Sequence, residues 1–177
     1  MIEYYGNTSD IIDWNQVIDS IKDQQPAYVG PSHKEGDPLP GLQEVVDLWK
    51  KGNYKTIAQG GTVGWDMFLP GQFDTAIVDK FIDFVGITSY TTAWISRIHP
   101  GHFSPIHWDV NDNEATLGDT VRFHCHMGKP AFGHVFIAED QCFYNKEQGS
   151  VYKWSSRKLW HAGTNCGLEP KYLFNIW

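Results

Sequence analysis

The chain has 177 residues, of which 41% are hydrophobic and 15% aromatic, and its formal net charge is −7. This length suits one domain over residues 1–177, which can bury a core without disulfide or metal staples. The acidic balance, without a cluster of Lys or Arg, argues against a nucleic-acid partner. Three cysteines without paired spacing favour a reducing compartment. Because no signal peptide and no apolar run of membrane-spanning length is visible, we expect a cytoplasmic protein without a membrane partner.

The first half of the sequence, residues 1–88, predicts a helical lead-in with loops. A polar cluster at 7–10 is a candidate cap for the first helix, and residues 23–40, rich in Pro, Gly and charge, predict a long loop. Apolar residues recur at helical spacing over three stretches, 11–21, 42–49 and 73–84. Gly86 is placed to end the third helix.

After Gly86 the hydrophobic pattern changes from helical to alternating. Strands are predicted over 91–98, 120–127, 134–138, 141–144, 151–154 and 172–177. In the second of these, Arg122, His124 and His126 share one face, opposite a row of apolar residues. Short strands at close spacing, without intervening helices, predict a barrel or sandwich. We therefore expect a mainly β (α+β) fold with its core at residues 89–177 and the N-terminal helices packed outside.

A His-Trp-Asp tripeptide at residues 107–109 is the strongest chemical signal. Residues i and i+2 of a strand share a face, so His107 and Asp109 can both point inward. His161 is the candidate third ligand, and two histidines with one carboxylate are typical of non-haem Fe(II) oxygenases. Zinc enzymes usually take such ligands from a helical His-Glu-x-x-His motif, which this sequence lacks. The tripeptide alone also fits a surface His beside a solvated Asp; the later His161, with Lys171 ten positions beyond it, favours the metal.

Three segments carry a resemblance to a known family: 98–109 with the His-Trp-Asp tripeptide, 121–130 with an Arg-x-His pattern, and 160–165 around His161. They resemble the 2-oxoglutarate/Fe(II)-dependent dioxygenase superfamily, in its aspartyl/asparaginyl β-hydroxylase (proline-hydroxylase-like) branch. The resemblance covers about residues 90–177. It implies a double-stranded β-helix, the jelly-roll of cupin-like proteins, with iron held by His107, Asp109 and His161. It also implies 2-oxoglutarate and O2 as cosubstrates.

The same resemblance implies roles for two cations. Arg122 would help to hold the 2-oxoglutarate carboxylates, and Lys171 would pair with the far carboxylate, where most relatives have Arg. Lys offers a point charge rather than a bidentate fork. Arg122 can instead form an ion pair with a barrel carboxylate. Either of His124 and His126 can contact the substrate or cosubstrate, or be a core histidine.

These features predict a dioxygenase that hydroxylates an amino-acid side chain, free or in a peptide, so that the partner is a small molecule or a peptide. One alternative is a cupin-like metal-binding protein or isomerase that acts on a small acid without oxygen. Another is a binding module that keeps only the fold. The sequence does not distinguish a free amino acid from a peptide substrate.

Overall fold

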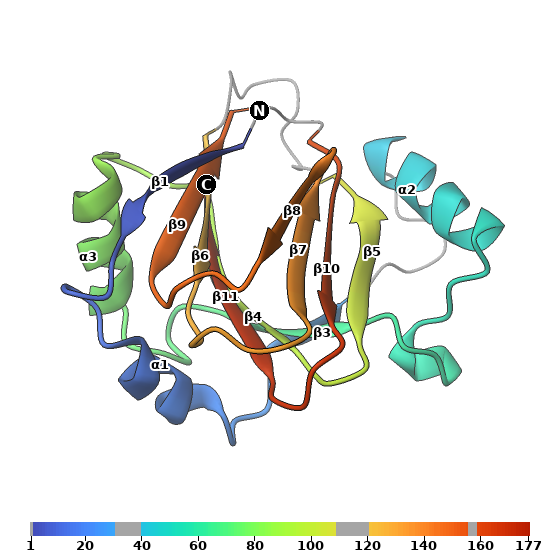
Figure 1. Cartoon of the computed structure of the whole chain (residues 1–177), viewed down its shortest axis with the longest axis horizontal. Coiled ribbons are helices and arrows are strands. Elements are labelled where there is room, and N and C mark those ends of the chain that lie inside the picture. The colour runs from blue at the N-terminus through green and yellow to red at the C-terminus, as the bar shows by residue number, and fades with distance from the viewer. Residues whose placement is uncertain (1, 31–39, 109–120, 156–158) are drawn as a thin grey trace.

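The computed structural model describes residues 2–30, 40–108, 121–155 and 159–177 (Figure 1). Within these ranges the chain is mostly β, with antiparallel sheets and three α-helices, as the sequence predicts. None of these helices is long and apolar enough to cross a membrane.

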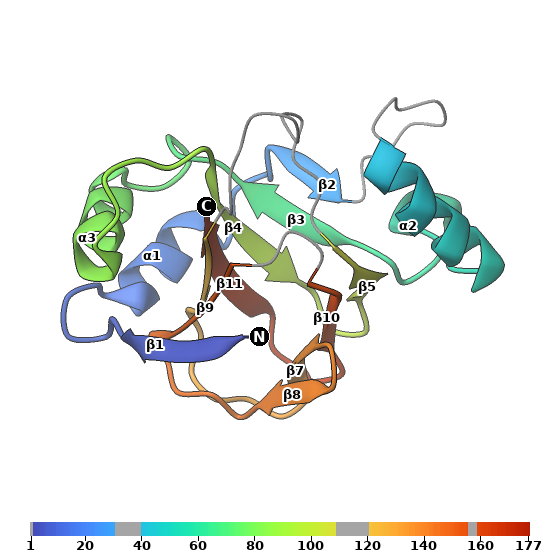
Figure 2. The ribbon, with the colours of Figure 1, turned by 90° about the horizontal axis from the view of Figure 1, so that it is seen from above.

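Two sheets face each other and enclose the interior of the molecule (Figure 2). Among the described residues, the large sheet holds seven strands in the spatial order β1 (Glu3–Asn7), β9 (Ser150–Trp154), β6 (Arg122–His126), β11 (Lys171–Ile176), β4 (Ala93–Ile98), β3 (Trp65–Phe68) and β2 (Tyr28–Gly30). The small sheet holds β5 (Phe103–His107), β10 (His161–Asn165), β7 (His134–Ala138) and β8 (Gln141–Tyr144). From β4 onward the chain passes repeatedly between the sheets, and Phe136 of the small sheet packs near Trp154 of the large one.

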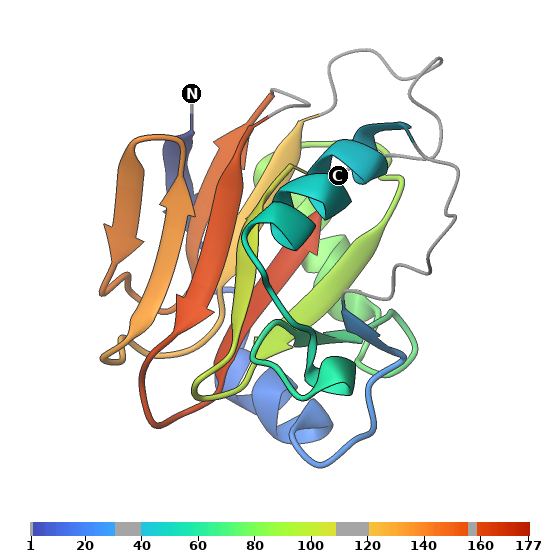
Figure 3. The same cartoon turned by 90° about the vertical axis from the view of Figure 1, so that its right-hand side faces the viewer.

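Two of the helices cover the outer face of the large sheet. These are α1 (Trp14–Ile21) and α3 (Ala76–Val85), whose apolar residues join the largest core cluster (Figure 1). The third, α2 (Pro40–Lys51), lies beside β5, where the indole N–H of Trp49 donates to the carbonyl of Ile106 at 2.9 Å (Figure 3). A 3₁₀ turn, Ile57–Gln59, follows it. All three predicted helices are therefore confirmed.

Local signals explain where these helices begin and end. Asp13 caps α1, since its carboxylate accepts from the N–H groups of Asn15 and Gln16. The cluster at 7–10 was the wrong candidate for this cap. Gly86 ends α3 in the left-handed conformation, with φ of 69°, as predicted.

The first half of the chain also contributes strands that the sequence pattern did not predict. β1, β2 and β3 all belong to it, and β2 lies within the predicted 23–40 loop. These strands have three to five residues, too short for alternation to stand out. In space, β1 forms one edge of the large sheet, and β3 with β2 forms the other.

A buried ion pair joins β3 to β4. Asp66 lies opposite Arg97 in the ladder, and its Oδ2 accepts from Arg97 Nε at 2.7 Å. The same oxygen lies 2.8 Å from His99 Nε2, and another guanidinium N–H donates to the carbonyl of Lys22 at 2.7 Å. Asp66 and Arg97 are both buried. Their charges tolerate burial because the two side chains form a hydrogen-bonded ion pair. Asp66 follows Trp65 on β3, so the two side chains point to opposite faces of the strand. The network gives His99 a structural role.

Candidate metal centre and anion pocket

Two of the three predicted metal ligands meet directly. His107 ends β5 and His161 begins β10, and the two residues are opposite one another in the antiparallel ladder. Their ring centroids are 4.3 Å apart. Opposed residues of a ladder place their side chains on the same face of the sheet. The β5–β10 pairing therefore brings together two imidazoles that are separated by more than fifty residues in the sequence.

Both imidazoles are oriented in the same way. Nδ1 of His107 donates to the carbonyl of Pro105 at 2.7 Å, and Nδ1 of His161 donates to the carbonyl of Leu159 at 2.9 Å. In each case the acceptor is the residue two positions earlier. A proton held at Nδ1 leaves the lone pair on Nε2, the tautomer that a metal requires. The backbone thus selects the ligating nitrogen of both rings.

Aromatic rings restrict the positions of both histidines. Trp65 of β3 stacks on His107 at 6.1 Å with an interplanar angle of 16°, and Trp49 meets it edge-on at 6.2 Å. Phe136 and Trp154 lie 5.9 and 6.0 Å from the ring of His161. Apolar walls of this kind exclude water from a site. The sequence pattern did not indicate Trp65, because its strand lies in the half that was expected to be helical.

The predicted third ligand, Asp109, lies outside the described residues. Among the residues that the structure describes, no group of three His, Cys, Asp or Glu side chains is close enough to hold a metal. The pair formed by His107 and His161 nevertheless fits a metal ion, because its Nε2 atoms carry lone pairs and its Nδ1 atoms are held by carbonyls.

Lys171 is buried at the start of β11, with 2% of its surface exposed. Its ammonium donates to the carbonyl of Val135 at 2.6 Å, so the side chain reaches from the large sheet to the small one. No carboxylate lies within ion-pair distance of it among the described residues. Burial lowers the pKa of Lys171 from 10.5 to about 7. A buried ammonium with one carbonyl partner has donors to spare for an anion.

The position of Lys171 relative to the histidines follows from β10. A Cβ at Gly163 would lie 3.7 Å from the ammonium nitrogen, so this nitrogen faces Gly163. Gly163 is two residues beyond His161 on the same strand face, about 7 Å along the strand. The ammonium and the imidazole pair are therefore separated by a distance comparable to the length of an extended five-carbon dicarboxylate.

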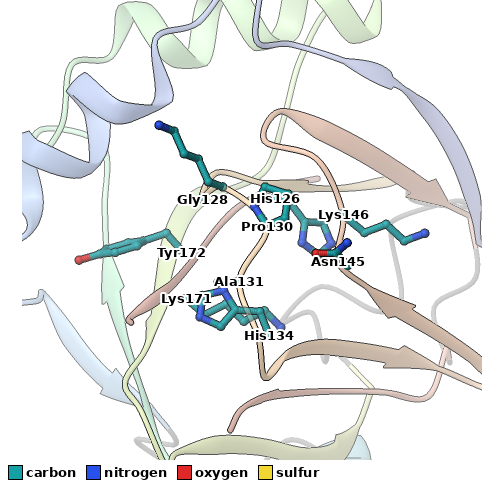
Figure 4. Close-up of a pocket in the computed structure, with 10 residues that line it drawn as sticks. His126, Gly128, Pro130, Ala131, His134, Asn145, Lys146, Lys171 and Tyr172 are labelled. Atoms are coloured by element: carbon teal, nitrogen blue, oxygen red, sulfur yellow. The ribbon is translucent and has the colours of Figure 1, made fainter. Parts of the chain in front are cut away.

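His126 and His124 occupy the interior face of β6, as the alternation predicted. Nδ1 of His124 is 2.9 Å from Oδ1 of Asn175, and its ring stacks on Phe136 at 4.3 Å. His126 lines a small pocket of about 10 Å³ together with His134 and Lys171 (Figure 4). Burial, with the positive charge of His124 and Lys171, holds the pKa of His126 well below its usual value, so this ring is neutral near pH 7.

Arg122 is also buried, but it does not join Lys171. It lies opposite Trp154 in the ladder, and its guanidinium carbon is 4.8 Å from the ring centroid of Trp177. Since Lys171 starts β11 and Trp177 follows its end, the two cations lie at opposite ends of that strand, about 20 Å of backbone apart. The structure therefore does not support the expectation that Arg122 shares one anion pocket with Lys171. It places Arg122 toward the end where Trp154 contacts His161.

No protein-family model and no curated protein matches the chain. Several solved structures are similar in backbone. A viral collagen prolyl hydroxylase from Paramecium Bursaria Chlorella virus-1, in complex with 2OG, is 20% identical over 64% of this chain and 76% of its own, with a TM-score of 0.47. A Trichoplax adhaerens prolyl hydroxylase bound to a hypoxia inducible factor peptide is 15% identical over 77% and 75%, with a TM-score of 0.46. A Pseudomonas putida prolyl-4-hydroxylase is 13% identical over 92% and 97%, with a TM-score of 0.44.

Proposed function

We propose that this chain is an Fe(II)- and 2-oxoglutarate-dependent dioxygenase that hydroxylates an amino-acid side chain, free or in a peptide. The observation that carries the proposal is the opposed pair of His107 and His161. The Nδ1–H group of each ring donates to a backbone carbonyl, and the buried ammonium of Lys171 lies in the same interior. Two imidazoles whose Nδ1–H groups are held by backbone carbonyls, and an interior ammonium without a carboxylate partner among the described residues, fit a metal and an acidic cosubstrate together.

The metal would be held by His107, His161 and Asp109. Asp109 follows His107 by two residues, so an extended backbone would present both on one face. When bound, iron with 2-oxoglutarate supplies the oxidative chemistry: 2-oxoglutarate, O2 and a substrate C–H bond give succinate, CO2 and a C–OH bond. The carbonyls of Pro105 and Leu159 keep the two imidazoles in the ligating tautomer, and the surrounding aromatic rings exclude water.

The cosubstrate would lie between the imidazole pair and Lys171. Lys171 would bind the far carboxylate and so set the direction in which the acid enters. Arg122, from its position near Trp154, would act on the near end of the acid rather than on the far one. Gly163, which has no side chain, would leave room for the acid beside the ammonium of Lys171.

The proposal also includes a double-stranded β-helix fold and a family branch. The regular passage of β4 to β11 between the two sheets supports a double-stranded β-helix, and an aspartyl/asparaginyl β-hydroxylase-like branch is proposed on the Arg-x-His pattern at Arg122 and His124. Residues 1–177 would form a single domain. O2 would complete the cosubstrates.

An anaerobic titration tests the proposal. Fe(II) is added to the purified protein, followed by 2-oxoglutarate, and the visible charge-transfer band of the chelate is recorded. We expect the band to appear only with both components and to be absent from His107→Ala protein. Admission of oxygen should then release succinate. A protein that binds Fe(II) without developing the band would contradict the dioxygenase assignment. It would favour a cupin-like metal-binding protein that acts on a small acid without oxygen.

A further inference from the structure

We propose that His126 is a second hydrogen-bond donor to the far carboxylate of the acid that Lys171 binds, and that the two residues together select 2-oxo acids with that second carboxylate. This inference rests on the proposed function and assigns a selectivity role to a residue of the same site.

The strand register places the two side chains together. His126 is the last residue of β6 and lies opposite Leu173 of β11, two residues from Lys171. Positions two apart on a strand share a face, so His126 and Lys171 both project into the interior. Both line the same small pocket (Figure 4).

Both groups lack the hydrogen-bond partners that burial normally requires. Nε2 of His126 is buried without a partner in the part of the chain that the structure describes, and His126 is only 7% exposed. The ammonium of Lys171 has three donors and one carbonyl acceptor there. Buried polar atoms are nearly always satisfied, so two adjacent deficits indicate an acceptor that a ligand supplies.

The neighbouring histidines are placed differently. His124 does not line this pocket, and its Nδ1 lies 2.9 Å from Oδ1 of Asn175. His134 does line the pocket, but its Nε2 lies 2.8 Å from the carbonyl of Glu169. His126 is therefore the histidine of this pocket whose buried Nε2 has no partner among the described residues.

The charge state suits a carboxylate. Lys129 and Lys146 line the same pocket as Lys171, so the pocket is already rich in positive charge. A neutral His126 with its proton on Nε2 would donate one hydrogen bond to the carboxylate without adding to the repulsion among these cations. The competing explanation is one water molecule between Nε2 and the ammonium, since a space of about 10 Å³ admits one.

The test compares two acids that differ only at the far end. Binding of 2-oxoglutarate and of 2-oxopentanoate, which has the same chain length without the far carboxylate, is measured by titration calorimetry on protein reconstituted with Zn(II), so that no turnover occurs. For His126→Phe we expect about a tenfold or greater loss of affinity for 2-oxoglutarate, the loss of one hydrogen bond to a charged group. Affinity for 2-oxopentanoate should stay within about twofold of the parent value.

Two further variants complete the design. His126→Gln restores an N–H donor and should recover most of the 2-oxoglutarate affinity. His134→Phe is the matched control, since it lines the same pocket but its nitrogen is committed to Glu169, and it should leave the ratio of the two affinities unchanged. If His126→Phe fails to fold, His126→Leu against His126→Gln makes the same comparison.

Equal effects of His126→Phe on both acids, or an effect on neither, would overturn the inference and favour the bridging water. A parent protein that binds neither acid would instead overturn the proposed function, and the inference with it.

Discussion

His161 lies directly opposite His107 across the β5–β10 ladder, with their ring centroids 4.3 Å apart. Each ring is held by a carbonyl two residues before it, so the backbone of the strand ends orients both imidazoles. This arrangement would pre-organise the pair for the proposed metal ion, and we expect the loss of either imidazole to affect metal binding more than folding.

Replacement of any of the three proposed ligands should abolish or strongly weaken Fe(II) binding, because the loss of one of three ligands also removes the geometry. The variants are His107→Ala, Asp109→Ala and His161→Ala, and the measurement is iron content after anaerobic reconstitution. His99→Ala is the control, since His99 pairs with Asp66 on the other network and should retain full iron. If His161→Ala keeps its iron, the third ligand has been assigned wrongly and His124 becomes a candidate.

Gly30→Ala should disturb the metal centre from β2. A Cβ at Gly30 would lie 2.5 Å from Cε2 of Trp65, so the indole that stacks on His107 must move. We expect a loss of stability of about 1–3 kcal/mol, typical of overpacking, together with weaker metal binding. Denaturant unfolding and metal titration check the two effects. Gly128→Ala is the control because its Cβ would meet no atom within 4 Å. An unchanged metal affinity in Gly30→Ala would show that Trp65 does not position His107.

Lys171→Met should weaken the binding of 2-oxoglutarate by at least about a hundredfold, since the loss of a desolvated charge partner costs about 3–5 kcal/mol. Iron affinity should change little. The same variant should be more stable than the parent without ligand, because Met fills similar space and no buried ammonium remains. We therefore expect Lys171→Met to bind 2-oxoglutarate more weakly than the parent but to be more stable without ligand. The charge-transfer titration measures the binding, and thermal unfolding measures the stability. A variant that binds 2-oxoglutarate like the parent would remove Lys171 from the site.

The pKa of Lys171, lowered by burial from 10.5 to about 7, predicts how stability changes with pH. Between pH 7 and 10.5 the unfolded state binds more protons at this residue than the folded state does. Its contribution therefore makes the ligand-free protein more stable as pH rises through this window. The measurement is the free energy of unfolding of the parent and Lys171→Met at several pH values. The parent should be less stable than Lys171→Met near pH 7, and the difference in their free energies of unfolding should become smaller as pH rises from about 7 to 9. A difference that does not change with pH would contradict the lowered pKa.

Ligand binding should show the opposite trend. A carboxylate beside Lys171 favours the charged ammonium, so binding takes up a proton above pH 7. The titratable groups that share the pocket of Lys171 include His126 from β6, His134 from β7, Lys129 and Lys146. The charge of Lys171 lowers the pKa values of both histidines. We expect the dissociation constant of 2-oxoglutarate to rise about tenfold per pH unit above pH 7. Lys171→Arg, which keeps its charge, should lose this dependence if it binds at all.

The sequence predicted the components of the site better than their arrangement. Alternation along one strand assigned Arg122, His124 and His126 to a single face, and the helices and the strands β7 and β8 followed from local periodicity. Register between strands was not readable, because it depends on pairings of distant segments. The opposition of His107 and His161, and the separation of Arg122 from Lys171, both follow from such register.

The placement of the first half of the chain was also not predictable from local pattern. Trp65 reaches His107 because β3 pairs with β4. A strand of four residues is too short for its hydrophobic pattern to predict that pairing. The buried Asp66 anchors this arrangement from a segment that was expected to hold only helices and loops.

The edges of the large sheet are formed by β1 and β2, which both belong to the N-terminal half of the chain. Their removal would change how the rest of the chain folds. A fragment that began at residue 89 would contain both histidines and Lys171 but would leave β9 and β4 as open edges. It would also bare the apolar face that α1 and α3 cover. Open strand edges recruit other strands, so such a fragment should self-associate rather than fold. We therefore expect the N-terminal half to protect residues 89–177 from aggregation, so that the two halves of the chain fold only together.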